Sequence, residues 1–176
     1  MFTKILVSID DSNMTQHVFD RAVSLAKATG GSLMLLHVIN PLDEPYVDSL
    51  FMQPTILYSE LHQETQKNNL NDWEKFKQDK ENWLRSLCES ATSSGVKTEF
   101  TLNLGDASNR ICDMARAWDA DVIVIGRRGH RGLSELFLGS VSNYVMHHAP
   151  CSVLTVQGAL NSTSEASQTK DAEASN

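Results

Sequence analysis

The chain is poor in cysteine, and none of its cysteines lies in a CxxC motif. The three that it has, Cys88, Cys112 and Cys151, are odd in number and widely spaced. This pattern argues against a disulfide scaffold or a structural zinc site, and it predicts reduced thiols that pack as small buried hydrophobes. Because reduced thiols are typical of the cytosol, we expect a cytoplasmic location.

Long apolar runs and positive charge are also missing. No run approaches the roughly 20 residues that a helix needs to cross a bilayer. The N-terminus, MFTKILVSIDDS, places charges inside and directly after its short apolar stretch, unlike a signal peptide. The 15 lysines and arginines face 22 aspartates and glutamates, for a net charge of −7. We therefore expect neither nucleic acid nor an anionic membrane surface as a partner.

What the sequence does contain is an alternation of strand-like and helix-like segments. β-rich or apolar runs predict five strands, at residues 4–9, 32–38, 96–102, 121–126 and 151–156. Helical spacing predicts four helices, at residues 13–29, 71–94, 107–118 and 140–148, the first of them capped by the side chains of Asp10–Ser12. Such alternation indicates an α/β fold with a doubly wound, five-stranded parallel sheet and helices on both faces.

The length of 176 residues suits one domain with a substantial core. We assign that domain to residues 1–158, with a proline-containing, partly helical insertion at about 40–70. The insertion is longer than the roughly 2–6 residues usual between elements of such folds. Trp73 and Trp83 are expected to pack it against the body of the domain, an exposed partner surface being the alternative. The small, polar residues 159–176 predict a disordered tail.

The topology of such a sheet predicts where a ligand binds. Open α/β sheets bind ligands beyond the carboxyl ends of their strands, where the strand order reverses. With the order 3-2-1-4-5, that point lies between Ile9-Asp10 and Ile125-Gly126, at the ends of the first and fourth strands. Asp10 is thereby placed beside the stretch GRRGHRGLSELFLGS, residues 126–140.

The glycines of this stretch predict a cradle for phosphate. Gly126 would end the strand and let the backbone turn sharply, while Gly129 and Gly132 would leave room for a ligand to approach main-chain N–H groups. Gly139 and Ser140 open the next helix, whose first N–H groups and dipole favour an anion. The spacing is not a Walker A loop, since no lysine precedes the serine, and it is not GxGxxG.

The spacing G-x2-G-x9-G-S, between a buried strand and a helix that ends near a proline, resembles the ATP-binding signature of the universal stress protein family. KILVSIDDS, LLHVI, GDASNRICDMARAWDADVIVIGRRG and GSVSNYVMHHAPCSVLTV resemble other blocks of that family, so the likeness covers residues 3 to about 157. It implies membership of the ATP-binding subgroup and an adenine nucleotide alpha hydrolase-like fold.

The resemblance also implies roles for the matching positions. Asp10 would lie near the ribose and phosphates, and the backbone around Val38 would contact the adenine. The ribose-triphosphate path would be lined by Gly126, Gly129, Gly139, Ser140 and Val141. The final strand, Cys151 to Val156, would pair antiparallel with its copy in a second subunit to give a homodimer. Since a carboxylate facing a triphosphate requires a divalent cation between them, ATP implies Mg²⁺, although no metal ligands are assigned.

Several charged side chains near the cradle have open roles: Arg127, Arg128, His130 and Arg131. The arginines either pair with phosphates or stay solvated, and nothing nearby in sequence would orient His130 as a base. His147 and His148 end a helix, where surface histidines are favoured over a metal pair.

The function indicated is that of an ATP-binding, dimeric stress-response regulator with at most slow ATPase activity. A binder of AMP or of a cyclic nucleotide is an alternative. An adenylating enzyme on the related fold, which carries SGGxDS after its first strand, is disfavoured because Ser8–Ser12 lacks both glycines. A phosphoacceptor receiver is disfavoured because no aspartate ends the third strand and no lysine ends the fifth.

Overall fold

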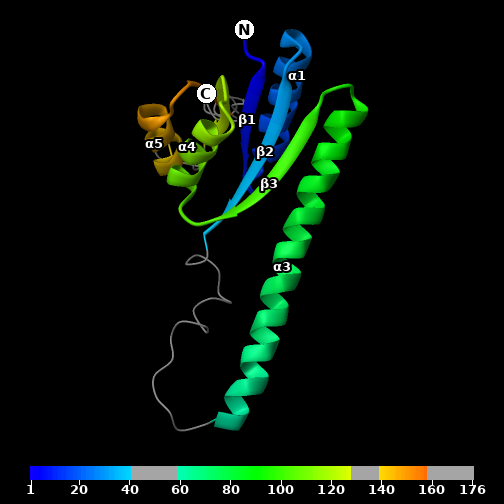
Figure 1. The fold of residues 1–176 in the computed structure, drawn as a ribbon, viewed down its shortest axis with the longest axis vertical. Helices are drawn as coiled ribbons and strands as arrows, with labels where there is room; N and C mark the ends of the chain where they lie inside the picture. The colour runs from blue at the N-terminus through cyan, green and yellow to red at the C-terminus, as the bar shows by residue number, and fades with distance from the viewer. Residues whose placement is uncertain (41–58, 128–138, 158–176) are drawn as a thin grey trace, which may run out of the picture.

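The computed structural model of the protein describes residues 1–40, 59–127 and 139–157, and over residues 59–70 it describes the backbone alone. These segments form a five-stranded sheet in which all neighbouring strands are parallel, in the order β3-β2-β1-β4-β5 (Figure 1). The strands are β1 (Lys4–Ile9), β2 (Ser32–Ile39), β3 (Thr98–Leu104), β4 (Val122–Arg127) and β5 (Ser152–Gln157). The predicted sheet and its strand order are confirmed.

Helices cover both faces of this sheet, as the alternating pattern predicts. They are α1 (Thr15–Thr29), α3 (Ser59–Ser93), α4 (Ala107–Ala117) and α5 (Ser140–His148). α1 and α3 bury their apolar side chains on one face, and α4 and α5 bury theirs on the other (Figure 1). None of the helices in the described residues is long and apolar enough to cross a membrane.

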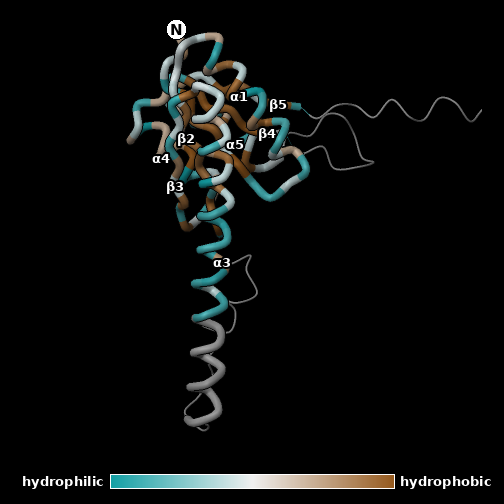
Figure 2. The backbone as a smooth tube through the Cα atoms, turned by 90° about the vertical axis from the view of Figure 1, so that its right-hand side faces the viewer, coloured by the Kyte–Doolittle hydropathy of each residue, from teal (hydrophilic) through white to brown (hydrophobic). Residues whose placement is uncertain are grey.

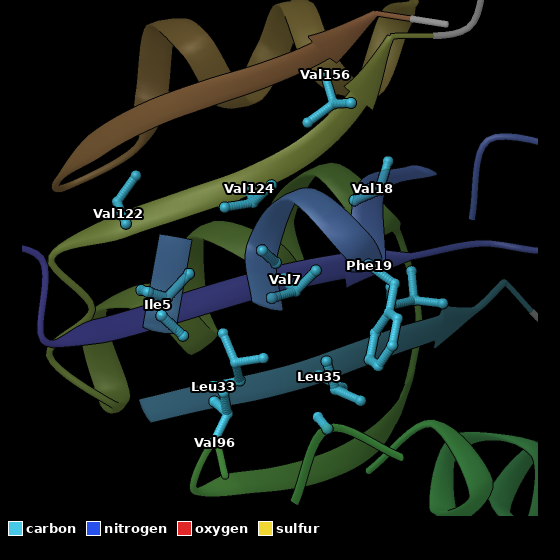
Figure 3. Close-up of a cluster of buried hydrophobic side chains, with 14 of the residues drawn as sticks. Ile5, Val7, Val18, Phe19, Leu33, Leu35, Val96, Val122, Val124 and Val156 are labelled. Carbon is cyan, nitrogen blue, oxygen red and sulfur yellow. The ribbon is translucent and has the colours of Figure 1, made fainter. Parts of the chain in front are cut away.

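The central strands carry the core because both of their faces are covered. In β1, Ile5 and Val7 point toward α1, whereas Leu6 between them packs on the side of α4 and α5 (Figure 3). All three are fully buried, and burial of a side chain of this size contributes roughly 1.5–3 kcal/mol. The strands therefore form the most hydrophobic part of the molecule, while the described part of α3 is largely polar (Figure 2).

α1 ends as predicted but does not begin as predicted. Gly30 follows it with φ 66°, a left-handed conformation that glycine adopts without strain. At the other end the cap residue is Met14, which makes no side-chain capping hydrogen bond, so capping by Asp10–Ser12 is wrong. The Asp10 carboxylate instead accepts hydrogen bonds from the backbone N–H and the hydroxyl of Ser12, which fold the chain into a turn before the helix.

α3 is longer than predicted, beginning at Ser59 instead of at about 71. The insertion was expected to contain only partial helix as far as residue 70, but residues 59–70 contain no proline or glycine and are rich in helix-compatible residues. The rest of the insertion, residues 41–58, lies outside the described residues, as does the tail from residue 158.

β3 lies two residues later than predicted, although it is an edge strand as expected. Val96 lies in the turn that follows α3, where its backbone N–H donates to the carbonyl of Ala91. Its apolar side chain is buried beneath that helix without belonging to the ladder, which begins where Thr98 pairs with Leu33.

Asp121 fastens the N-terminus to the start of β4. Its Oδ2 accepts hydrogen bonds from the Thr3 hydroxyl at 2.7 Å, the Thr3 backbone N–H at 2.8 Å and the Lys4 backbone N–H at 2.9 Å. These hydrogen bonds, that of the Thr3 hydroxyl first, lower the pKa of Asp121 to about 2 because they favour its charged form. The carboxylate thereby holds β1 in register beside β4.

Candidate functional site

The carboxyl ends of β1, β2 and β4 border a cavity of about 550 Å³. The turn before α1 and the first turns of α4 and α5 complete its wall. This is the point at which the strand order reverses, because β1 has β2 on one side and β4 on the other. The cavity therefore lies where a doubly wound sheet places its ligand.

The cavity brings together six of the seven predicted site residues: Asp10, Val38, Gly126, Gly139, Ser140 and Val141. They come from β1, β2, β4 and α5, which are far apart in the sequence. The seventh residue, Gly129, lies outside the described residues, and so do Arg128, His130, Arg131 and Gly132. The fold thus gives six of the predicted residues a shared position.

The N-terminus of α5 opens into the cavity. Gly139 precedes the helix with φ −57° and ψ 152°, and as a glycine it has no side chain that could cap the first turn. The first N–H groups of a helix have no partner within it and attract anions, an effect that the helix dipole strengthens. No acidic side chain lies in this first turn to repel one. The site can therefore accept a negatively charged group at Ser140 and Val141.

Gly126 serves the site differently from the prediction. It lies inside β4, which continues to Arg127, so a sharp turn at Gly126 is wrong. A Cβ at this position would lie 3.1 Å from Cγ2 of Val18 and 3.7 Å from Cβ of Met14. A side chain here would be crowded, because the start of α1 packs closely against the strand. That close packing brings the turn of Asp10 beside the end of β4.

His37 is a cavity residue that the sequence reasoning missed. It is 6% exposed and lies next to Val38 in β2. Its Nδ1 lies 2.8 Å from the carbonyl oxygen of Ile9, and because a carbonyl only accepts, Nδ1 carries the hydrogen. On its other side the ring meets Trp83 of α3 edge-on. The signal that would have identified it is a lone imidazole within the buried run SLMLLHVI.

Asp11 and Lys80 connect the rim of the cavity to α3. Asp11 lines the cavity, and the Lys80 ammonium donates a hydrogen bond to its Oδ2. The Lys80 side chain is only 17% exposed, whereas that of Asp11 is 56% exposed. No local sequence pattern predicts this pair, because the two residues are 69 positions apart.

Other candidate groups lie away from the cavity or take structural roles. His148 is exposed, stacks on Tyr144 with ring centroids 3.9 Å apart and directs Nδ1 to the Tyr144 carbonyl, as expected of a surface histidine. Trp83 packs on the core as predicted, whereas Trp73 stacks on Phe76 of its own helix. Within the described part of the chain, no three histidine, cysteine or acidic side chains gather into a metal site.

The cysteines behave as packing residues. All three are free thiols; Cys112 is buried, and Cys88 and Cys151 are half-buried. Burial raises the pKa of each thiol, because a thiolate would lose its hydration. The prediction of reduced, inert thiols agrees with this environment, although only Cys112 is fully buried.

Comparison with known proteins assigns the sequence to a family. The sequence model of the universal stress protein family matches residues 1–157. Universal stress protein Sll1388 of Synechocystis is 36% identical over 162 residues, which cover 89% of this chain and 98% of the relative. Universal stress protein YxiE of Bacillus subtilis is 33% identical over 159 residues, covering 89% of this chain and all of the relative.

Solved structures share the fold at lower identity. The structure of the hypothetical protein MJ0577 superposes with a TM-score of 0.68 at 20% identity, covering 91% of this chain and 99% of the other. A universal stress protein in complex with cAMP superposes with a TM-score of 0.59 at 19% identity, covering 90% of this chain and 98% of the other. A family member from Arabidopsis thaliana with AMP bound superposes with a TM-score of 0.56 at 21% identity, covering 93% of this chain and 97% of the other. At such identities the likeness shows a common fold.

Proposed function

Because the chain belongs to the universal stress protein family, we propose that it is an ATP-binding member that holds its nucleotide in the cavity at the strand ends. One observation carries this proposal: six residues predicted to surround an adenine nucleotide line a single cavity at a helix N-terminus whose cap residue is a glycine. In solved structures of two other proteins of this fold, AMP and cAMP are bound. An adenine nucleotide is therefore the ligand class that both observations favour.

The roles that we propose for the cavity residues are those that the family resemblance implies. The backbone at Val38 contacts the adenine, and Asp10 lies near the ribose and phosphates. Main-chain N–H groups at Ser140 and Val141 receive phosphate oxygens, and Gly126, Gly129 and Gly139 leave the backbone accessible to them. Asp10 and Asp11 line the same cavity, and carboxylates suit Mg²⁺, which prefers oxygen ligands and would neutralise phosphate charge there.

We propose a regulatory function for the bound nucleotide. Among the described residues of the cavity we assign no activated nucleophile and no general base, so hydrolysis is at most slow. The protein would act in the cytoplasm as a homodimer paired through β5, with nucleotide occupancy changing its conformation or its partners. An AMP or cyclic-nucleotide sensor is the alternative, favoured by the ligands of the two solved relatives.

The test is to identify and titrate the nucleotide. Nucleotide released by acid from the purified protein is identified by mass spectrometry, and ATP, ADP, AMP and cAMP are titrated calorimetrically with and without Mg²⁺. ATP with Mg²⁺ should bind most tightly, and the Gly129→Val/Gly139→Val variant should lose binding because the added side chains fill the cradle. The backbone at Gly139 is one that any residue adopts, so valine introduces no strain there.

Ala117→Val is the matched control, because Ala117 is exposed at the end of α4 and does not line the cavity. It should bind nucleotide as the wild type does. Tightest binding of AMP or cAMP would select the alternative. Absence of binding by the wild-type protein would overturn the assignment.

A further inference from the structure

α3 brings a covered positive charge to the rim of the cavity. The Lys80 ammonium lies 5.0 Å from the ring centroid of Phe76 and 6.0 Å from that of Trp83, and it donates to the carboxylate of Asp11. Its side chain is 17% exposed, unusually low for a lysine. Aromatic faces attract a cation, so the two rings and the carboxylate together fix where the charge lies.

The spacing along α3 explains why these groups converge. Phe76 precedes Lys80 by four residues and Trp83 follows it by three, which places all three on one face of the helix. Trp83 is in turn held by its edge contact with His37, a residue of the cavity wall. The position of Lys80 is thus tied to the cavity by two contacts, one through Asp11 and one through Trp83.

The charge of Lys80 matters because Asp10 and Asp11 both line the cavity. Two carboxylates side by side would repel the phosphates of a nucleotide, and repulsion between like charges is stronger beside a protein wall than in open water. Lys80 cancels the charge of Asp11. Of the two carboxylates that line the described part of the cavity, Lys80 therefore compensates one.

We propose that Lys80 sets the charge of this cavity and so selects for polyphosphorylated nucleotides, an inference that rests on the proposed nucleotide function. Lys80 does not have to touch the ligand to do this. Its effect must grow with the number of charges on the ligand and vanish for a neutral one. It must also be cancelled when the charge of Asp11 is removed.

The experiment measures dissociation constants for adenosine, AMP, ADP and ATP without divalent cations in 0.1 M salt. Lys80→Gln should weaken ATP binding about 3- to 10-fold, weaken AMP binding less and leave adenosine binding within about twofold. Asp11→Asn should strengthen ATP binding, and the Asp11→Asn/Lys80→Gln double variant should return close to the wild type. In 1 M salt, where the screening length falls to about 3 Å, the Lys80→Gln effect should shrink.

Lys77→Gln is the matched control. Lys77 lies on the same helix, bonds Glu74 at 2.8 Å, contacts the ring of Trp73 and does not line the cavity. It should keep the wild-type affinities within about twofold, since exposed pairs of this kind contribute little.

The outcomes separate this inference from the proposed function. If the wild type binds ATP and Lys80→Gln binds all four ligands as the wild type does, the role of Lys80 is overturned and the proposed function stands. Equal weakening for adenosine and ATP would show that Lys80 only maintains the structure, which also overturns it. If the wild type binds none of the four in this buffer but binds ATP when Mg²⁺ is added, the role of Lys80 is overturned and the proposed function stands. If it binds no nucleotide with or without Mg²⁺, both proposals fail together.

Discussion

The edge of Trp83 meets the ring of His37, with centroids 5.4 Å apart and an interplanar angle of 87°. His37 belongs to β2 and lines the cavity, whereas Trp83 belongs to α3 and packs against the hydrophobic core. Edge-to-face aromatic contacts are directional, so a shift of one ring alters the surroundings of the other. The contact therefore connects the cavity to the longest helix of the protein.

This contact predicts that Trp83 reports on ligand binding. In a Trp73→Phe/Trp118→Phe variant, Trp83 is the one remaining tryptophan. Addition of a nucleotide beside His37 should change its fluorescence intensity or emission maximum in a saturable manner. The Trp83→Phe/Trp118→Phe variant, which keeps only Trp73, should show little change. Equal responses of the two variants would contradict the proposed connection.

The fold could be predicted because its strongest signals are local. The apolar runs around Leu35 and Val124 mark strands that are buried on both faces, and Gly30 marks the end of α1. The start of α3 was predicted too late because the prolines between residues 41 and 54 indicated a segment with only partial helix. A helix that begins among polar residues has no apolar periodicity from which its first residue could be predicted.

The candidate site could be predicted only in part. Asp10 and Gly126 were brought together by topology, since the ends of β1 and β4 must adjoin when the strands pair. The pairing of Asp11 with Lys80 could not be predicted, because neither residue lies in a local sequence pattern that indicates a distant partner. Gly126 was assigned to a turn because glycine often marks turns. Its close approach to Val18 could not be predicted, since that contact forms only when α1 packs against β4.

Gly126 should tolerate no larger side chain. In Gly126→Ala the new Cβ lies 3.1 Å from Cγ2 of Val18, which is buried and has little room to move. Overpacking of this kind costs about 1–3 kcal/mol of unfolding free energy. The Gly126→Ala/Val18→Ala double variant should lose less unfolding free energy than the two single variants lose in sum. Urea denaturation of the four proteins measures this coupling, and simple additivity would contradict the close packing.

Asp121 should make stability depend on pH in the acid range. Its pKa is about 2 in the folded protein, below its ordinary value of 3.8, so the unfolded chain takes up the proton first as pH falls. Its stabilising contribution is therefore complete above about pH 4 and is lost as pH falls through about 2. Asp121→Asn should lower the melting temperature at pH 7, and the difference from the wild type should disappear toward pH 2.

Asp113→Asn is the comparison for this change. Asp113 is exposed and pairs with Arg116 at 3.2 Å, a surface contact of small value. Its effect on the melting temperature at pH 7 should be smaller than that of Asp121→Asn. If the melting temperatures of Asp121→Asn and the wild type differ as much at pH 2 as at pH 7, the role of the carboxylate is contradicted.

The proposed dimer predicts opposite results at the two edges of the sheet. Leu154 is 41% exposed on β5, and Leu104 is 44% exposed at the end of β3, the other edge strand. If β5 pairs antiparallel with its copy, Leu154→Asp places two like charges close together in the interface and should give a monomer at micromolar concentration. Leu104→Asp introduces the same charge at the opposite edge and should stay dimeric. Sedimentation equilibrium distinguishes these results, and dissociation by Leu104→Asp alone would move the interface to β3.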